Sequence, residues 1–401
     1  MNCLVDFRRI GPIVTVVFCY AALLLSPTND AFAADNQTEK LQQIRDNYLE
    51  ARRQLKRGMY RLTTDMEMRN PDRNEKLGRI VQLRSIFDRS NSQEYLEVHQ
   101  ENSRGLLTPL ELTPQNLKRT RERAAKFQVE HPVRHHYSVR NMESLAIIDY
   151  SGSPGQRHRS YGNITLLKPD KNFSRLSSFL SPLSEAKFLS PLMLGLEFGN
   201  AQTLESAWER LIRYSVPTAQ NKSEVKIEEE TDGLKRLEIL FHFSYFEPGR
   251  EVVKFRGRQV LFIDPSRGYS IPRIEIYQNK AEDNLSDSLL MLGTADWVEK
   301  NDVWVPVNTS WTRYEGEEVA RSCNTHVTWE SVNPPAGTFD PSLFTYEELA
   351  GVVGQAGVKN RLDVIDSRGE QPRQLGRVNT QGVFIPATLQ KTPELPPLPT
   401  E

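Results

Sequence analysis

Residues 251–330 contain four or five consecutive stretches with the pattern of β-strands, most of them separated only by short turns. Residues 260–263 lead into Asp264-Pro265-Ser266-Arg267-Gly268, where an early proline and a late glycine are typical of a tight turn. The next strand is expected over residues 269–278, and Asn301-Asp302 is a two-residue signal for a hairpin. Strands joined in this way pair with their sequence neighbours, so the stretch predicts an antiparallel meander.

The rest of the chain adds strands and two amphipathic helices. Residues 38–57 carry apolar side chains at helical spacing, with Gly58 as a suitable stop, and Thr203 precedes a second such pattern. Further strands are expected at residues 60–68, 76–88, 93–100, 134–148, 160–167, 224–230 and 234–245. Helices segregated from a long meander are typical of the α+β class.

The first 33 residues have the pattern of a secretory signal peptide. A short basic region precedes an apolar run over residues 13–25, and Ala31-Phe32-Ala33 forms a small-x-small cleavage motif before Ala34. The run is shorter than the roughly 20 residues that a membrane-spanning helix needs. We therefore expect cleavage between Ala33 and Ala34 and a periplasmic or secreted mature protein; a retained N-terminal anchor is the alternative.

The charge balance argues against a nucleic-acid partner. The chain has 51 Lys and Arg residues against 52 Asp and Glu residues, for a formal net charge of −1 at pH 7. Binding to phosphate backbones needs a basic surface. A local basic segment over residues 118–140 is interpreted as a solvated helix face, with contact to anionic lipid or polymer as the alternative. Contact with a membrane after signal cleavage is expected to be peripheral at most.

Two of the three cysteines, Cys3 and Cys19, lie within the expected signal peptide. The mature chain then keeps one thiol, Cys323, and cannot form an internal disulfide. Cys323 shares the period-two pattern of Val319 and Val327. We expect it to be a small buried side chain rather than a nucleophile.

An apolar stretch broken by prolines, residues 172–198, is the main candidate for a ligand-lining segment. The pentapeptide Phe-Leu-Ser-Pro-Leu occurs in it twice, at residues 179–183 and 188–192, and its prolines exclude a long regular helix or a central strand. The stretch is either a flap over a cavity or a connector whose leucines fill one end of the core. With two strand methionines, the candidate lining residues are Met66, Met68, Phe179, Leu183, Phe188, Leu192 and Met193.

Histidines at three nearby positions invite a metal interpretation that strand geometry disfavours. Pro132 argues against a helix, so His135 and His136 would point to opposite faces of a strand. His131 would lie roughly 13 Å from His135, too far to share an ion. His326 and Glu330 are also four residues apart on one strand. We expect no metal site and no cofactor.

No motif for nucleophilic catalysis or nucleotide binding is present in the sequence. Gly152-Ser153-Pro154-Gly155 lacks the G-x-S-x-G spacing of a hydrolase nucleophile. We expect a protein that is not an enzyme; a hydrolase with an unrecognised site ranks behind the binding and structural hypotheses.

The C-terminal part changes composition after a short helix expected at residues 346–349. Gly351, Gly354 and Gly357 follow, and the chain ends in a proline-rich run over residues 392–399. Such segments bury too little apolar area to fold. We therefore expect a signal peptide at 1–33, a sheet domain at 34–350 and a disordered tail at 351–401.

This layout resembles the LolA/LolB-like family of periplasmic lipoprotein carriers. The strand-turn-strand Phe262-Ile263-Asp264-Pro265-Ser266-Arg267-Gly268-Tyr269-Ser270-Ile271-Pro272 and the hairpin Asn301-Asp302-Val303-Trp304-Val305-Pro306 are similar to divergent exported bacterial relatives, particularly planctomycete ones. The resemblance implies a strongly curved antiparallel sheet, an incomplete β-barrel, with helices packed on it over an apolar cavity for acyl chains.

Two functions of different classes follow. The first is an exported, non-catalytic protein that binds a lipid, an acyl chain or another apolar ligand in a half-barrel, with lipoprotein sorting as one role. The alternative is a cell-envelope structural or protein-interaction module whose sheet is filled by its own side chains. A cavity of ligand size favours the first.

Overall fold

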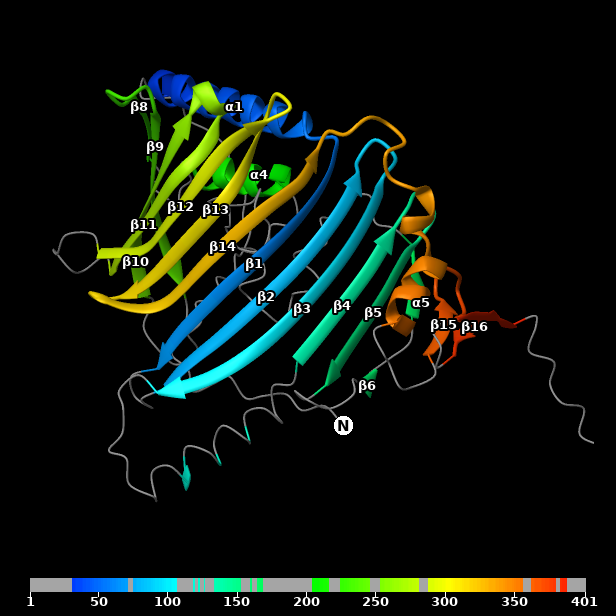
Figure 1. Ribbon diagram of the computed structural model, residues 1–401. Coiled ribbons are helices and arrows are strands. Elements are labelled where there is room, and N and C mark those ends of the chain that lie inside the picture. Colours follow the sequence, from blue (N-terminus) through cyan, green and yellow to red (C-terminus); the bar gives the residue numbers. More distant parts are fainter. Residues whose placement is uncertain are drawn as a thin grey trace, which may run out of the picture.

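The computed structural model describes residues 31–70, 75–106, 118–119, 122, 126, 133–152, 159–160, 164–168, 204–215, 224–245, 253–280, 288–355, 362–379 and 383–387. In this part of the chain, 17 strands form one large, curved sheet (Figure 1). Among the described residues, three continuous α-helices accompany it. None of the described helices is both long and apolar enough to cross a membrane. The segment with Phe179, Leu183, Phe188, Leu192 and Met193 lies outside the described residues.

The helices are α1 (Ala31–Arg53), α4 (Leu204–Ser215) and α5 (Tyr346–Gln355), and two 3₁₀ turns are η4 (Pro265–Arg267) and η5 (Pro341–Phe344). The first strands are β1 (Arg57–Asn70), β2 (Glu75–Asp88), β3 (Gln93–Leu106), β4 (Val133–Arg140), β5 (Leu145–Gly152), β6 (Arg159–Ser160) and β7 (Ile164–Leu167). The second series is β8 (Glu224–Glu229), β9 (Lys235–Tyr245), β10 (Val253–Asp264), β11 (Ser270–Lys280), β12 (Ser288–Lys300), β13 (Val303–Glu315) and β14 (Glu318–Val332). The last are β15 (Leu362–Asp366), β16 (Arg373–Val378) and β17 (Phe384–Pro386).

Two antiparallel meanders make up the sheet, and the first strand of the chain joins them. Strands β8 to β14 pair consecutively, as do β1 to β5. Strand β1 pairs antiparallel with β14. Beyond β5, β7 leads to β15, β16 and β17, with β7 and β15 parallel. The sheet does not close on itself, which confirms the α+β class with an incomplete barrel.

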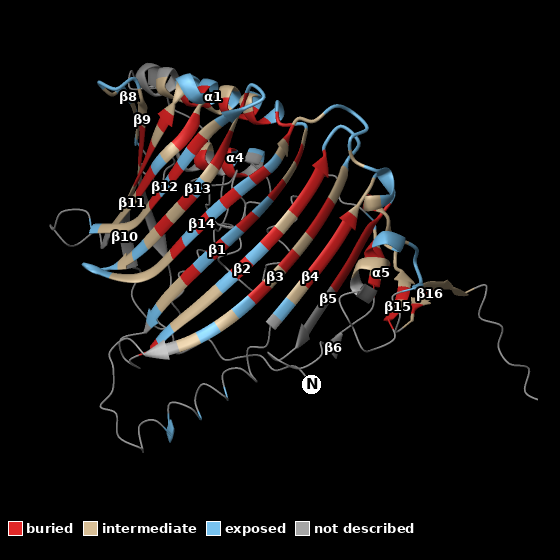
Figure 2. Cartoon of the chain, in the orientation of Figure 1, coloured by how far each residue is buried: buried red, intermediate tan, exposed pale blue. Residues whose placement is uncertain are grey.

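The sheet has one face that is apolar over most strands, here called the inner face, and an opposite outer face. Along β1 and β14 buried and exposed residues alternate (Figure 2), as the period of two requires. A row of directly paired residues follows the inner face across seven strands: Leu237, Leu261, Ile274, Gly293, Trp311, Cys323 and Met66. Gly293 is needed in this row because a Cβ there would lie 2.6 Å from Ile274 Cγ2.

Helices α1 and α4 cover the inner face at its β9–β11 end. In α4, Ala207, Trp208 and Leu211 follow helical spacing and are at most 1% exposed. They pack with α1 residues such as Leu41 and Ile44 and with apolar residues of β9, β10 and β11. The rings of Tyr48 and Trp208 lie 5.4 Å apart. This cluster fixes both helices on the sheet.

Helix α5 lies on the outer face at the other end of the sheet. Leu349 and Ala350 are fully buried and share a core with Tyr95 and Val139 of β3 and β4. The two faces are thus covered at opposite ends.

The expectation of a disordered tail from residue 351 is wrong for the described part of that segment. Helix α5 continues to Gln355, and β15 and β16 add Leu362, Val364 and Val378 to the core under α5, each at most 2% exposed. The physical reason is that these few apolar residues alternate and bury against β7, which composition alone does not reveal. The sheet domain therefore extends beyond residue 350.

Two boundaries differ from the sequence expectation. Helix α1 ends at Arg53, and Gly58 lies inside β1, where a Cβ would lie 2.8 Å from the Phe87 ring. The strand expected over residues 134–148 is a hairpin, because Asn141 Oδ1 accepts from the backbone N–H groups of Glu143 and Ser144. An asparagine that holds its own backbone in this way forms a turn without glycine or proline.

The expected turns of the second meander are confirmed. Asp264 caps η4 through Ser266 N at 3.0 Å, and Gly268 ends it with φ of 61°. Asn301 and Asp302 have φ of 49° and 59°, as a type I′ hairpin requires. These turns set the register of the strands that carry the site.

Alkaline pH should weaken the packing of α1. Burial raises the pKa of Tyr48 to about 12, although the nearby Arg52 cation lowers it. Above about pH 10 the unfolded phenol ionises before the folded one, so unfolding releases a proton and stability falls up to about pH 12. We expect Tyr48→Phe to reduce this slope by about 1.4 kcal/mol per pH unit, measured by urea unfolding. Equal slopes in the two proteins would contradict the prediction. The contributions of the other buried tyrosines to the slope are the same in both proteins, so they cancel in the comparison.

Candidate functional site

Two of the seven candidate lining residues, Met66 and Met68, lie in the described part of the chain, and neither side chain is exposed. Met66 is 5% exposed on the inner face, where it pairs with Cys323, and Met68 is half-buried near the end of β1. The expected cleavage residues Ala33 and Ala34 lie in the first turns of α1. The burial expected for Cys323 is confirmed, since it is 1% exposed and its Sγ lies 3.9 Å from Thr325 Oγ1.

An apolar surface extends over the inner face of β1–β3, β13 and β14. The rings of Tyr60 and Trp329 lie 4.8 Å apart, and Trp329 Nε1 donates to Pro306 O at 2.8 Å. Trp311, Val327 and Leu62 continue the surface along neighbouring strands. Apart from Leu55, which follows α1, the buried members of this cluster are strand residues. Among the described residues, neither α4 nor α5 contributes to it.

A hollow of about 410 Å³ lies on the outer face, where β12, β13, β14 and β1 run side by side. Its exposed polar side chains form two rows of directly paired residues. One row is Asp296, Asn308, His326 and Thr63, and the other is Thr294, Ser310, Asn324 and Asp65. Thr309 and Thr325, which belong to the buried face, complete the lining. This arrangement is called the polar hollow below.

Hydrogen bonds already order both rows of the polar hollow. Asn308 Nδ2 donates to Asp296 Oδ2 at 3.1 Å, and His326 Nδ1 lies 2.8 Å from Asn308 Oδ1. In the other row, the hydroxyls of Thr294 and Ser310 are 2.8 Å apart. The strands thus hold these side chains at fixed spacing before any ligand binds.

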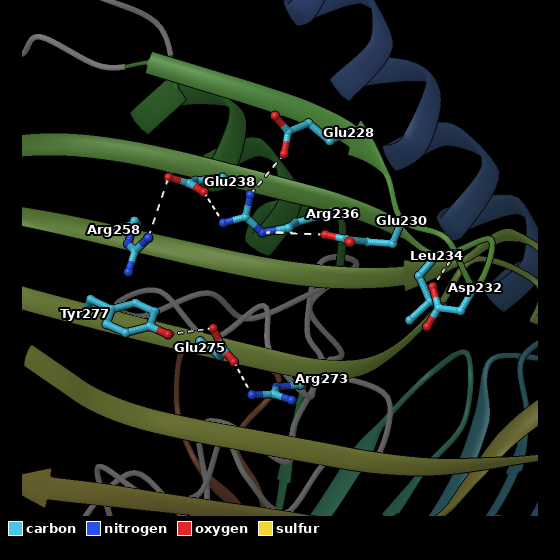
Figure 3. A network of polar contacts seen from close by, with 10 residues as sticks. All are labelled: Glu228, Glu230, Asp232, Leu234, Arg236, Glu238, Arg258, Arg273, Glu275 and Tyr277. Atoms are coloured by element: carbon cyan, nitrogen blue, oxygen red, sulfur yellow. Dashed lines mark hydrogen bonds and ion pairs between the residues drawn. The ribbon is translucent and has the colours of Figure 1, made fainter. Parts of the chain in front are cut away.

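Next to the polar hollow, the outer face of β8–β11 carries a network of charged side chains (Figure 3). Arg236 bonds to Glu238 and lies 3.1 Å from Glu228. Arg258 lies 4.0 Å over the Tyr277 ring, whose hydroxyl donates to Glu275 at 2.7 Å.

Glu238 and Glu275 are only 8% and 9% exposed, and each carboxylate lies beside an arginine. Arg236 pairs with Glu238, and Arg273 pairs with Glu275. These ion pairs tie the strands of the network together.

The histidines meet different partners from those considered in the sequence. His99 Nδ1 lies 3.1 Å from His135 Nδ1, and His99 Nε2 lies 2.9 Å from Glu101 Oε1. His326 contacts Asn308 across strands, while Glu330 pairs with Arg61. No group of three or more metal-ligating side chains occurs within the described ranges.

The comparisons with known proteins identify no family for this chain. No protein-family model matches its sequence, and no curated protein matches it. Among solved structures, a DUF1329 family protein from Desulfovibrio piger ATCC 29098 aligns with 77% of this chain and 98% of its own, at 10% identity and a TM-score of 0.33. A similarity this weak carries no argument about this chain.

The residues of the polar hollow were not singled out as a site in the sequence, apart from the test of His326 as a metal ligand. The residues of its two rows occupy the polar positions of alternating strands, which is also the pattern of an ordinary solvated face. Only the register between four strands brings them together. The hairpin turn at Asn301-Asp302 fixes β12–β13, and the turn at Gly316, where φ is 66°, fixes β13–β14. No local signal fixes β14 against β1.

Proposed function

We propose that this protein is an exported, non-catalytic binding protein that holds a lipid, acyl chain or other apolar ligand on the inner face of its curved sheet. The LolA/LolB-like resemblance of the sequence and the signal-peptide pattern support export to the periplasm or beyond. Lipoprotein or lipid transfer is the role that this arrangement serves. The protein acts without a metal, a cofactor or nucleic acid.

The observation that carries the proposal is the apolar inner face of β1–β3, β13 and β14. Tyr60, Trp311 and Trp329 give it a broad aromatic surface, and Met66 adds a flexible thioether. An acyl chain gains about 0.8 kcal/mol for each CH₂ group that it buries, without needing any polar partner. A surface of this composition suits an elongated apolar ligand better than a polar substrate.

The position of the described helices also fits a carrier. Helices α1 and α4 pack on the β9–β11 end of the inner face, through the cluster around Trp208 and Ile239. Among the described residues, neither helix contributes a side chain to the buried cluster at the β1–β3 end, which consists of strand residues and Leu55. An apolar ligand along that end would extend the core already formed under the two helices.

Brominated fatty acids provide the test, because bromine quenches tryptophan fluorescence only at close range. Trp311 and Trp304 form a matched pair on β13, since Trp311 belongs to the apolar cluster of the inner face, whereas the half-buried Trp304 packs in a separate cluster with Ala295 and Trp297. We expect saturable quenching of the wild-type protein by a bromostearate. Trp311→Phe should lose a large part of the quenched signal, while Trp304→Phe should keep it.

A packed interior without ligand is the second candidate, and the burial of the inner face favours it. Trp311 and Trp329 are 6% and 5% exposed, and Met66 and Cys323 are also buried. In that case the protein is a cell-envelope structural or interaction module. Absence of bromostearate quenching, or quenching carried by Trp304, would select this candidate and reject the carrier.

A further inference from the structure

We propose that the polar hollow on the outer face binds a neutral saccharide that lies across strands β12, β13, β14 and β1. The site is separate from the inner face, because successive residues of one strand point to opposite sides of the sheet. Thr325 illustrates this, since it lies between the two rows of the lining but its hydroxyl bonds to Thr64 at 2.8 Å within the core, whereas Asn324 and His326 are exposed.

The first argument is preorganisation. The Asn308 carboxamide is held at both ends, because its Nδ2 donates to Asp296 and its Oδ1 faces His326 Nδ1. A carboxamide oxygen can only accept, so the shared hydrogen is on His326 Nδ1. In the neutral ring, Nε2 is then an acceptor, which suits a ligand hydroxyl.

The second argument is the supply of free hydrogen-bonding groups. Within the part of the chain that the structure describes, no side-chain hydrogen bond reaches Thr63, Asp65 or Asn324. These three exposed side chains offer a hydroxyl, a carboxylate and a carboxamide. Sugar hydroxyls donate and accept at once, so they can satisfy a mixed array of this kind.

The third argument is charge, which excludes an anionic ligand. No Lys or Arg is among the residues that line the polar hollow. Arg273 pairs with Thr294 at the end of one row, and Arg61 lies two residues before Thr63 on β1; they form ion pairs with Glu275 and Glu330. A phosphate or sulfate group would meet Asp65 and Asp296 instead of a cation. The hollow therefore selects uncharged donors.

The fourth argument is the separation of the two carboxylates, which excludes a single bound cation. Asp296 lies on β12 and Asp65 on β1, and three strand spacings separate them, about 14 Å at 4.8 Å each. Calcium needs its oxygen ligands at about 2.3–2.6 Å. A ligand that uses both carboxylates must span the four strands, as an oligosaccharide of two or three units does.

Shape supports the same conclusion. The β12–β13 register shifts between Asp296 and Trp297, so that Asn308 and Pro306 are their partners. Bulges of this kind increase the local twist and re-aim side chains next to binding sites. The volume of about 410 Å³ is within the range of roughly 300–1,000 Å³ for small-molecule sites.

Titration calorimetry of the full chain with maltotriose, cellotriose and chitotriose tests the proposal. We expect saturable binding of at least one of these neutral trisaccharides at millimolar concentrations. Asn308→Ala and Asp65→Ala should each weaken it about tenfold, the equivalent of one good hydrogen bond. Thr312→Ala is the matched control, because Thr312 lies on β13 outside the lining and pairs with Leu292 and Ser322.

Thermal unfolding should be nearly unchanged in all three variants, because Asn308 and Asp65 are exposed. Absence of binding by all three trisaccharides would overturn the proposal, as would binding that Asn308→Ala and Asp65→Ala leave intact. Saturable binding of Ca²⁺ or inorganic phosphate that these variants abolish would also overturn it. Trp311→Phe on the inner face should leave trisaccharide binding unchanged, so failure of the apolar carrier function is distinguishable from failure here.

Discussion

Replacing Trp208 by alanine should lower the free energy of unfolding by about 3–5 kcal/mol, the usual cost of truncating a fully buried tryptophan. The side chain is 0% exposed and sits where α4, α1 and the inner face meet. Its ring lies against Tyr48, so the cavity would open between the two helices. Neither helix can close it without leaving its strand contacts.

Urea unfolding followed by circular dichroism measures this effect, and Trp208→Phe provides the control because it keeps an aromatic ring. We expect the phenylalanine variant to lose clearly less stability than the alanine variant. Trp304→Ala, a half-buried tryptophan outside this cluster, should also cost less. A loss below about 1 kcal/mol for Trp208→Ala would show that the helices repack freely.

Replacing Arg52 by methionine should cost about 3 kcal/mol, because a buried guanidinium fastens α1 to the ends of two hairpins. Its Nη1 donates to Trp304 O and its Nη2 to Gly268 O at 2.8 Å. The Cζ atom lies 4.4 Å over the Trp297 ring. Charged hydrogen bonds contribute about 1.5–3 kcal/mol each, and the two carbonyls would lose their partner.

Arg52→Lys separates geometry from charge, since one ammonium cannot reproduce the planar fork that reaches both carbonyls. We expect its stability to lie between the wild type and Arg52→Met. Burial lowers the pKa of Arg52. A guanidinium group keeps its proton in proteins, so the charge is available to the fork. Equal stability of the lysine variant and the wild type would contradict a role for the fork.

Strands and turns with strong local signals could be predicted from the sequence. Alternation placed Cys323 on a buried face, and Asn301-Asp302 located a two-residue hairpin. The hairpin hidden in residues 134–148 escaped detection because Asn141 turns the chain through its own side chain. The strands after residue 360 escaped because their few apolar residues stand among glycines and charges.

The polar hollow could not be predicted because its residues come together only through pairing between distant strands. His326 was considered with Glu330 on its own strand, whereas its hydrogen-bond partner is Asn308 on the neighbouring one. The rows also require β1 beside β14. Period-two patterns indicate which side of a strand is buried, but not which strand lies next to it.

The pairing of β1 with β14 has a consequence for the order in which the chain can fold. The hydroxyls of Thr64 and Thr325 meet across 261 positions of sequence. A loop of that length must close before this contact forms, and domains dominated by such contacts fold slowly. Until β14 has been synthesised, β1 is an unpaired edge of the first meander, and open edges of this kind recruit other chains. A chain that stops before Glu318 keeps that edge permanently, so premature termination there converts the seam of the sheet into a starting point for aggregation.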